Sequence, residues 1–422
     1  MARYPQLQTD ISALFFKPLE GIYSGSEHRY DCQSISDLHF AALGVLRCLS
    51  HAKTGHEFLQ HHADQEVAHI EVSHFFKALK SPRRGRNLAS LNARLRPLMA
   101  VRLADPFAEF EELNDFDLFA ADGHYHHAAC FDPKPAVASG HFFRLDLRTH
   151  HLGHLDLSRP KDGHKKDHDI TALKRADAAT LRDHAPTGRK VIYAWDKACI
   201  DYHLWHRLKH RHGIYFITRA KENSVAERCS ENRLDTADPR NAGLAGDYYV
   251  GTSNGVQLRR IIYTDPRDGV TYRHLTNEFT LPARLIVIIY KLRWDIEKVF
   301  HQLKSKMEER KSWASSPTAK TSHALFERLA HNLTLLFERY IKENEGRQDE
   351  LEEKRAKGRD PHRKNREGTV MKKDALDFVQ KAIQRATQRT VRFIRWLRSF
   401  LYRPVPWACA MARLAQIWRA HA

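Results

Sequence analysis

The chain has 422 residues, a formal net charge of +18 at pH 7 and an apolar fraction of 42%. This length predicts two or three domains, and the apolar fraction is sufficient to fill their cores. So large a positive charge indicates a polyanionic partner, first of all nucleic acid. A ribosomal or membrane-surface protein would also fit the charge, but such proteins are usually smaller or more one-sided in composition.

Neither the start of the chain nor its apolar runs indicate a membrane or a secretory route. The first ten residues, MARYPQLQTD, lack a basic segment followed by an apolar stretch. The longest apolar runs, such as 285–290, are far shorter than the ~20 residues that cross a bilayer. Six scattered cysteines without a CxxC pair argue against zinc clusters and disulfides. We expect a cytoplasmic protein without a membrane segment.

The N-terminal region, 1–112, is predicted to be helical and to bind DNA. Apolar residues recur at intervals of three and four in 37–52 and 70–81. The basic stretch 81–102 contains both Gly and Pro. It is consistent with a pair of DNA-contacting helices or with a solvated linker.

From about residue 115 the pattern changes to strands and helices in alternation. Two apolar strands, 114–122 and 188–196, each end in an aspartate, Asp122 and Asp196. The segment 141–158 alternates like a hairpin, and 201–213 resembles a helix that is stopped by a glycine. A further strand is expected from about 213. The pattern predicts an α/β fold with a mixed sheet.

The second half of the chain begins with β-type runs and ends in basic helices. Runs within 224–280 indicate a β-rich insertion, and a helix is expected to start near Pro282. A highly charged linker follows residue 340. Residues 336–422 thus form a linker and a basic C-terminal helical tail. The tail could contact DNA, mediate dimerisation or dock as a terminal helix; its arginines recur at helical spacing: Arg385, Arg389, Arg392 and Arg395.

The stretch YKLRWDIEKVFHQLK carries four polar side chains: Tyr290, Arg293, Glu297 and Lys304. In one α-helix each residue advances about 100°, so all four would share an arc of about 60°. Cations and a phenol suit phosphate contacts, and a carboxylate among them suits a metal ion beside the phosphates. A stripe of ion pairs on a solvated face is the alternative.

The two strand-end aspartates could converge with Glu297. Neighbouring strands in an α/β sheet bring their carboxyl ends to one edge, where sites form. Three converging carboxylates would repel one another without a cation, and oxygen ligands select Mg²⁺ or Mn²⁺. Two such ions can support phosphodiester displacement, as in a polynucleotidyl transferase or nuclease. Taken singly, Asp122 could form a turn and Asp196 could cap a helix.

These residues resemble those of bacterial insertion-sequence transposases of the DDE type, and of the insertion-sequence-four group in particular. That group is marked by Y-x2-R-x3-E-x6-K, which the four residues from Tyr290 to Lys304 match in full. Asp122 before Gly matches the first acid and Asp196 the second. Where the group often has Arg-Gly-Tyr after the second acid, this chain has Lys-Ala-Cys at 197–199. The resemblance covers about 115–335.

The resemblance implies a ribonuclease-H-like core in 113–335 with its β insertion before the glutamate. It implies a catalytic and metal-binding trio, Asp122, Asp196 and Glu297, that uses Mg²⁺ or Mn²⁺, as two ions. Three further residues are implied to contact DNA: Tyr290, Arg293 and Lys304.

The implied function is cut-and-paste DNA transposition. The partners would be double-stranded DNA with terminal inverted repeats, target DNA and a second copy of the chain in a synaptic homodimer. Members of the group commonly form a hairpin intermediate. Three alternatives stay open: a catalytically inactive DNA-binding product of a decayed element, a related ribonuclease-H-like nuclease, and a structural or RNA-associated basic protein.

Overall fold

A computed structural model describes most of the chain between residues 10 and 419. The described ranges are 10–23, 35–52, 54–64, 70–126, 139–158, 168–183, 185–221, 226–252, 255–266, 268–307, 312–344, 393–401 and 406–419.

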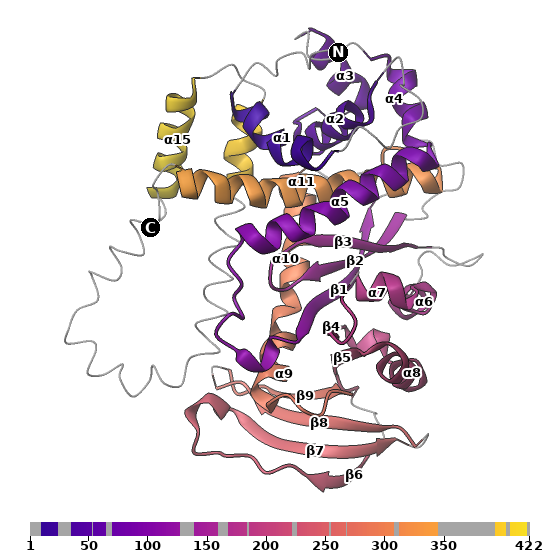
Figure 1. Ribbon diagram of the computed structural model, residues 1–422, viewed down its shortest axis with the longest axis vertical. Helices are drawn as coiled ribbons and strands as arrows, with labels where there is room; N and C mark the ends of the chain where they lie inside the picture. Colours follow the sequence, from indigo (N-terminus) through magenta and orange to yellow (C-terminus); the bar gives the residue numbers. More distant parts are fainter. Residues whose placement is uncertain are drawn as a thin grey trace, which may run out of the picture.

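The centre of the fold is a nine-stranded mixed sheet with the strand order β3-β2-β1-β4-β5-β9-β8-β7-β6 (Figure 1). The strands are β1 (Phe116–His126), β2 (Ser139–Asp146), β3 (Leu152–Leu157), β4 (Lys190–Ala194), β5 (Ile214–Arg219), β6 (Ala226–Glu231), β7 (Leu244–Thr252), β8 (Gln257–Thr264) and β9 (Thr271–Thr276). Strands β1, β4 and β5 run parallel, and the remaining neighbours pair antiparallel.

Helices cover both faces of this sheet, and the first five gather at one end of the molecule. They are α1 (Asp10–Ile22), α2 (Asp37–Leu49), α3 (Gly55–Asp64), α4 (Val72–Leu79), α5 (Pro82–Arg102), α6 (Asp169–Arg175), α7 (Ala178–Arg182), α8 (Tyr202–His212), α9 (Ala283–Leu292), α10 (Trp294–Lys306), α11 (Pro317–Asn344) and α15 (Trp407–Arg419). Short 3₁₀ turns are η2 (Glu111–Leu113), η3 (Lys197–Cys199) and η4 (Pro239–Asn241).

Strand β1 lies between two apolar cores, and its side chains point alternately into one and the other. Leu118 and Ala120 face a large core shared with α9, α10, α11 and the N-terminal helices. Phe119 and Ala121 face a smaller core shared with α6 and α8. Because successive side chains of a strand point to opposite faces, both sides of this strand must be apolar. The apolar run ahead of Asp122 is thus explained by burial on two sides.

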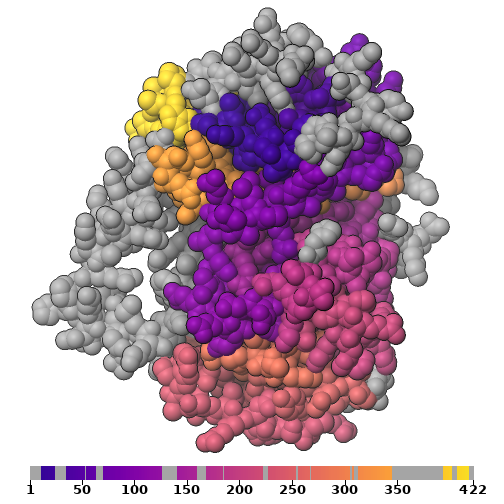
Figure 2. Space-filling model, in the orientation of Figure 1, coloured from indigo at the N-terminus to yellow at the C-terminus, as the bar shows by residue number. Residues whose placement is uncertain are grey.

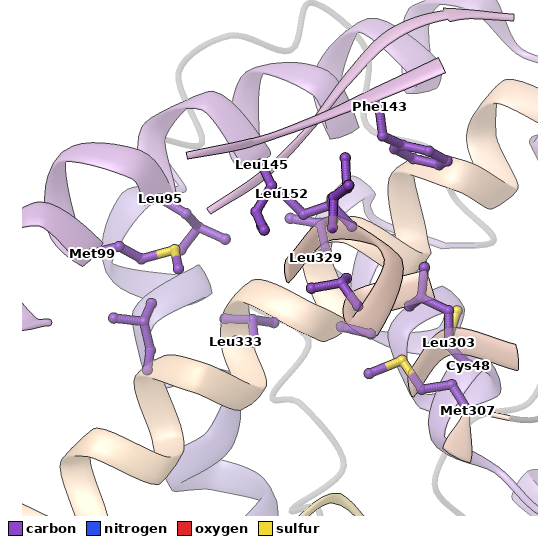
Figure 3. Close-up of a cluster of buried hydrophobic side chains, with 14 of the residues drawn as sticks. Cys48, Leu95, Met99, Phe143, Leu145, Leu152, Leu303, Met307, Leu329 and Leu333 are labelled. Carbon is purple, nitrogen blue, oxygen red and sulfur yellow. The ribbon is translucent and has the colours of Figure 1, made fainter. Parts of the chain in front are cut away.

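The large core joins the N-terminal helices to the sheet, so the two parts pack as one body. Figure 3 shows the junction, where side chains of α5, β2, β3, α10 and α11 meet. Leu95 and Met99 come from α5, and Leu329 and Leu333 come from α11. Helix α11 crosses residue 335 without a break. The division of the chain into domains at 112 and 335 stays a prediction.

The expected form of the basic stretch 81–102 is wrong. It is one continuous 21-residue helix, α5, rather than a helix pair or a linker. Ser81 caps its first turn by accepting a hydrogen bond from the Arg84 N–H. Leu88, Leu91 and other apolar residues bury one face against α11. Tertiary packing outweighs the helix-breaking tendency of the internal Pro97.

Strands β6–β9 lie in the segment where β-type runs are predicted, between β5 and α9. They extend the central sheet, since β9 pairs with β5 through Thr276 and Ile217. Figure 2 shows these strands and the N-terminal helices at opposite ends of the molecule. A mixed sheet flanked by helices is compatible with the expected ribonuclease-H-like core. No helix within the described ranges is long and apolar enough to cross a membrane.

The described part of the C-terminal tail docks on the N-terminal helices. Residues 393–400 are helical, and Trp396 and Leu397 are buried. The Arg398 guanidinium donates to the carbonyls of Leu49 and Ser50, at the carboxyl end of α2. This portion behaves as a docked terminal helix with Arg395 exposed. The charged linker and the arginines at 385, 389 and 392 lie outside the described residues.

A buried polar network fixes α11 against α5 and β3. The Asn332 side chain accepts from the Leu152 N–H at 2.9 Å and donates to Asn92 Oδ1 at 2.8 Å. The Asn92 amide in turn donates to the Leu152 carbonyl at 3.2 Å. Both asparagines are fully buried, so each of these groups depends on the others for its hydrogen bonds.

Asn332→Ala should lower the free energy of unfolding by about 2–5 kcal/mol, because it leaves the buried Leu152 N–H and Asn92 Oδ1 without partners. Urea unfolding followed by circular dichroism measures the change. Arg339→Ala on the same helix is the control, since its ion pair with Glu343 is exposed and should contribute less than about 1 kcal/mol. Equal effects of the two substitutions would contradict the role of the network.

Candidate active site

Asp122 and Asp196 stand just beyond the paired part of two adjacent parallel strands, β1 and β4. The pairing of β1 with β4 aligns Ala120 with Ala194. Each aspartate stands two residues beyond this pair, so the two acids lie at the same level of the sheet. Asp122 remains within β1, whereas Asp196 follows β4 and caps η3, accepting from the Lys197 N–H at 2.7 Å. The two acids are aligned as expected, but the prediction that a strand ends at Asp122 is wrong. Strand β1 continues to His126, because its last residues pair with β2.

The prediction of one continuous helix from Tyr290 to Lys304 is wrong. Helix α9 ends at Leu292 and α10 begins at Trp294, with Arg293 between them. The Arg293 N–H bonds to the Tyr290 carbonyl and the Arg293 carbonyl accepts from Ile296, both across three residues. This tighter spacing is that of a 3₁₀ turn, which changes the direction of the side chains that follow.

Arg293 connects the two helices to the strand-end acids. Its Nη1 donates to Asp122 Oδ2 at 3.2 Å, and its Nη2 lies 3.0 Å from Glu297 Oε1. The arginine side chain is only 7% exposed, compared with 33% for Glu297. One guanidinium therefore bridges the first acid and the glutamate. Converging carboxylates need a positive charge to offset their repulsion, and in this structure the Arg293 guanidinium provides it.

Burial raises the pKa of Asp122 to about 6. This pKa of about 6 is the net result: burial and the carboxylates of Asp169 and Glu297 raise it, whereas Arg293 and the Gly123 N–H lower it. Removal from water penalises the charged form, and like charges nearby add to that penalty. The ionised Asp122 carboxylate is consequently short of positive charge, which is the condition that favours cation binding.

Tyr290 is buried at the end of α9, not on an open face. Its ring centroid lies 4.8 Å from that of His274 on β9, and the Arg293 guanidinium lies 5.9 Å from the ring. Burial raises the pKa of the Tyr290 phenol, and the Asp196 carboxylate adds to the increase. The same interactions show that Tyr290, Arg293 and Asp196 share one neighbourhood.

Lys304 and Trp294 present their side chains to solvent on α10. Lys304 is exposed in the last turn of the helix. Trp294 is 57% exposed, and the Arg293 guanidinium lies 5.4 Å from its ring. Of the four motif residues, Tyr290, Arg293 and Glu297 thus gather at the acids, whereas Lys304 stands on the outer surface.

A fourth carboxylate, Asp169, was missed by sequence reasoning. It opens α6, and its Oδ1 would lie 2.5 Å from a Cβ built on Gly123. The glycine after Asp122 therefore permits the close approach of Asp169. Both aspartates raise the pKa of the buried Cys199 thiol, after the effect of burial itself. Asp169 is the first residue of α6, a common position for an acid, so its residue type alone did not distinguish it in the sequence.

The competing acids have structural partners. Asp201 caps α8, where its Oδ1 accepts from the Leu204 N–H at 2.9 Å. Asp295 is buried, and its Oδ1 accepts from the Lys298 ammonium at 2.6 Å. Asp132 lies outside the described residues. Asp201 and Asp295 thus each have a structural contact within their own helix, and the choice of Asp196 and Glu297 over them stays a prediction.

The donor set is that of a hard divalent cation. Asp122, Asp196, Asp169 and Glu297 all offer carboxylate oxygens, the ligands that Mg²⁺ and Mn²⁺ prefer. Within the described ranges, no three His, Cys, Asp or Glu residues are close enough together to form a ready-made metal cluster. Arg293 lies between two of the candidate ligands. The chemistry of the site fits a metal, and the side chains must rearrange to bind one.

Part of this chain is similar to known transposases. Residues 143–333 match the family described as "Transposase DDE domain". The matched segment contains Asp196, Glu297 and Lys304 and begins after Asp122. The chain is also 29% identical over 156 residues to "Putative transposase y4zB" of Sinorhizobium fredii (strain NBRC 101917 / NGR234). That alignment covers 34% of this chain and 43% of the relative, so the chain spans less than half the length of that protein.

The two similarities support a DDE transposase. Of the acids described above, Asp196 on the β4 side and Glu297 on α10 lie within the matched segment.

His274, which supports Tyr290, should make stability sensitive to acid. Burial lowers the pKa of His274 to about 3, whereas an unfolded histidine titrates near 6.5. Its contribution is therefore complete above pH 6.5 and is lost as the pH falls towards 3. His274→Phe should reduce the slope of unfolding free energy against pH, between pH 6 and 4, by up to about 1.4 kcal/mol per unit.

Urea unfolding at several pH values measures that slope for the wild type and for His274→Phe. The control is Val101→Ala, because Val101 is exposed and carries no titratable group, so the slope should stay unchanged. Identical slopes for the wild type and His274→Phe would mean that native His274 accepts a proton as readily as an unfolded histidine.

Proposed function

We propose that this protein is the DDE transposase of an insertion sequence, of the insertion-sequence-four group, and that it cleaves transposon ends and joins them to target DNA. The proposal rests chiefly on one observation. Asp122 and Asp196 stand two residues beyond the last pair of the adjacent parallel strands β1 and β4, and Arg293 links Asp122 to Glu297. Asp196, Arg293 and Glu297 lie within the segment similar to transposases, and Asp122 precedes it. Asp122, Asp196 and Glu297 come from three distant parts of the sequence. Acids with only local structural roles would have no reason to lie near one another.

In this proposal, Asp122, Asp196 and Glu297 hold Mg²⁺ or Mn²⁺, as two ions. When bound, such ions activate an attacking oxygen and stabilise the leaving oxygen of a phosphodiester. The protein holds the carboxylates in register through the β1–β4 pairing and brings Glu297 to them on α10. One site can serve both cleavage and joining, because each step is an in-line phosphodiester displacement.

Arg293 and Lys304 are assigned to the DNA backbone, together with Tyr290. Arginine can donate to a phosphate through two N–H groups, and lysine adds a point charge. Lys304 lies seven residues beyond Glu297, roughly 10 Å along the helix axis, so it would contact a different phosphate from the one that is cut. The net charge of +18 favours binding to DNA as a whole.

The proposed partners are double-stranded DNA with terminal inverted repeats, target DNA and a second copy of the chain. Pairing of two ends requires two active sites, so a homodimer is the expected assembly. We place the protein in the bacterial cytoplasm, on the nucleoid. The N-terminal helices are proposed to bind the ends, with the exposed surface of the C-terminal tail available for DNA or for the second copy.

Asp122→Asn, Asp196→Asn and Glu297→Gln should each reduce cleavage by at least about 10²-fold, because each removes a ligand from a metal centre that contributes several kcal/mol. The assay incubates the full-length protein with Mg²⁺ or Mn²⁺ and DNA carrying the inverted repeats that flank the gene. Asp201→Asn is the matched control. It should retain cleavage, because asparagine caps α8 as well as aspartate does.

Cleavage that survives all three substitutions would refute the catalytic assignment. Wild-type binding to the repeats without cleavage would indicate a decayed element. An absence of any preference for the repeats would favour a structural or RNA-associated protein.

Lys304→Ala should weaken binding to the transposon end and reduce the slope of log affinity against log salt by about one. The reason is the loss of one phosphate contact. Fluorescence anisotropy with labelled end DNA, measured over a range of salt concentrations, reports both quantities. Arg339→Ala, which removes an exposed cation on α11, is the control and should leave the slope unchanged. An unchanged slope for Lys304→Ala would mean that Lys304 is only a solvated side chain.

A further inference from the structure

Arg293 lies between Asp122 and Glu297, two of the residues that are proposed to bind a divalent cation. Its two terminal nitrogens contact two different carboxylates, Asp122 at 3.2 Å and Glu297 at 3.0 Å. The other oxygen of Asp122 accepts from the Gly123 N–H at 2.8 Å. Both oxygens of Asp122 are therefore engaged, one by a backbone group and one by the guanidinium.

A guanidinium and a divalent cation cannot both hold these carboxylates at full strength. Mg²⁺ requires oxygen at about 2.0–2.1 Å, in a near-ideal octahedral shell. A guanidinium hydrogen-bonded to the same oxygen would then lie within a few ångströms of the ion. In this part-buried site, two such positive charges repel more strongly than they would in water. The arginine and the metal are consequently competitors for Asp122 and Glu297.

Two aromatic rings lie near the Arg293 guanidinium. Its guanidinium already lies 5.4 Å from the ring of Trp294 and 5.9 Å from that of Tyr290. Its Nε is buried and has no hydrogen-bond partner. Because Trp294 is 57% exposed, a guanidinium that turned towards this ring would approach the surface of the molecule. An arginine that leaves the carboxylates can therefore present its charge to a bound polyanion.

We propose that Arg293 is an internal counterion that a divalent cation displaces, and that the displaced guanidinium then binds a DNA phosphate. This inference rests on the proposed function, since it concerns the same metal site. It adds a regulatory coupling: metal and DNA favour each other because each binds the arrangement in which Arg293 has left the carboxylates. By linkage, the two binding free energies must then be coupled reciprocally.

The first test is Mn²⁺ binding to the full-length protein without DNA, measured by calorimetry and by electron paramagnetic resonance of free Mn²⁺. Arg293→Gln should bind Mn²⁺ about tenfold more tightly than the wild type, because the competing charged hydrogen bonds are lost. Arg293→Lys should fall between the two, since one ammonium cannot bridge both carboxylates as a guanidinium does. Arg339→Gln, which removes an exposed cation on α11 away from the carboxylates of the site, is the control and should bind Mn²⁺ like the wild type.

Equal or weaker Mn²⁺ binding by Arg293→Gln would overturn the inference, because Arg293 would then orient the ligands instead of competing with the metal. If Arg293→Gln fails to fold, Arg293→Lys decides the matter by the same criterion. Wild-type protein that binds no Mn²⁺ would overturn both the inference and the metal assignment. Wild-type cleavage of DNA ends together with unaltered Mn²⁺ affinity in the variants would overturn the inference alone.

The second test measures the released charge. End DNA is titrated over a range of salt concentrations with and without Ca²⁺, which is used as a cation of the same charge. In the wild type, Ca²⁺ should increase the slope of log affinity against log salt by about one more than it does in Arg293→Gln, because one additional phosphate contact forms. Equal changes in the two proteins would contradict the transfer of Arg293 from carboxylate to phosphate.

Discussion

The parallel pairing of β1 with β4 is the constraint on which the rest of the site depends. It sets two distant segments in one register, so that the residues two positions past Ala120 and Ala194 come to the same edge of the sheet. Both strands are apolar on two faces, and the cores on either side hold them in this register. A shift of one residue would turn Asp122 to the opposite face, away from α10.

The electrostatics of the site follow from this geometry. Carboxylates from β1, α6, α10 and the end of β4 gather in a region that is partly removed from water. Such a set needs positive charge, and Arg293 supplies one unit at the break between α9 and α10. The break between α9 and α10 therefore positions the site. It points the buried Arg293 guanidinium at Asp122 and places Glu297 one turn further along α10.

The helical part of the molecule holds α10 in place. Helix α11 lies against α5, α2 and β3, and the Asn92–Asn332 network fixes its register against the sheet. The large core includes buried residues of these helices and of α9 and α10. The C-terminal helix at 393–400 also belongs to this core, and its Arg398 bonds to the end of α2. The position of Glu297 relative to the strand-end acids thus depends on packing that extends through most of the described chain.

The sequence by itself determined the local elements and the chemistry. The strands of the central sheet, the helix that stops at Gly213 and the candidate acids Asp122, Asp196 and Glu297 follow from apolar periodicity and residue type, because these are local properties. Only the tertiary structure decided that 81–102 is one buried helix, that the chain turns at Arg293 and that Asp169 joins the site. Those features depend on contacts between segments far apart in the sequence, and such contacts leave no periodic signal in either segment.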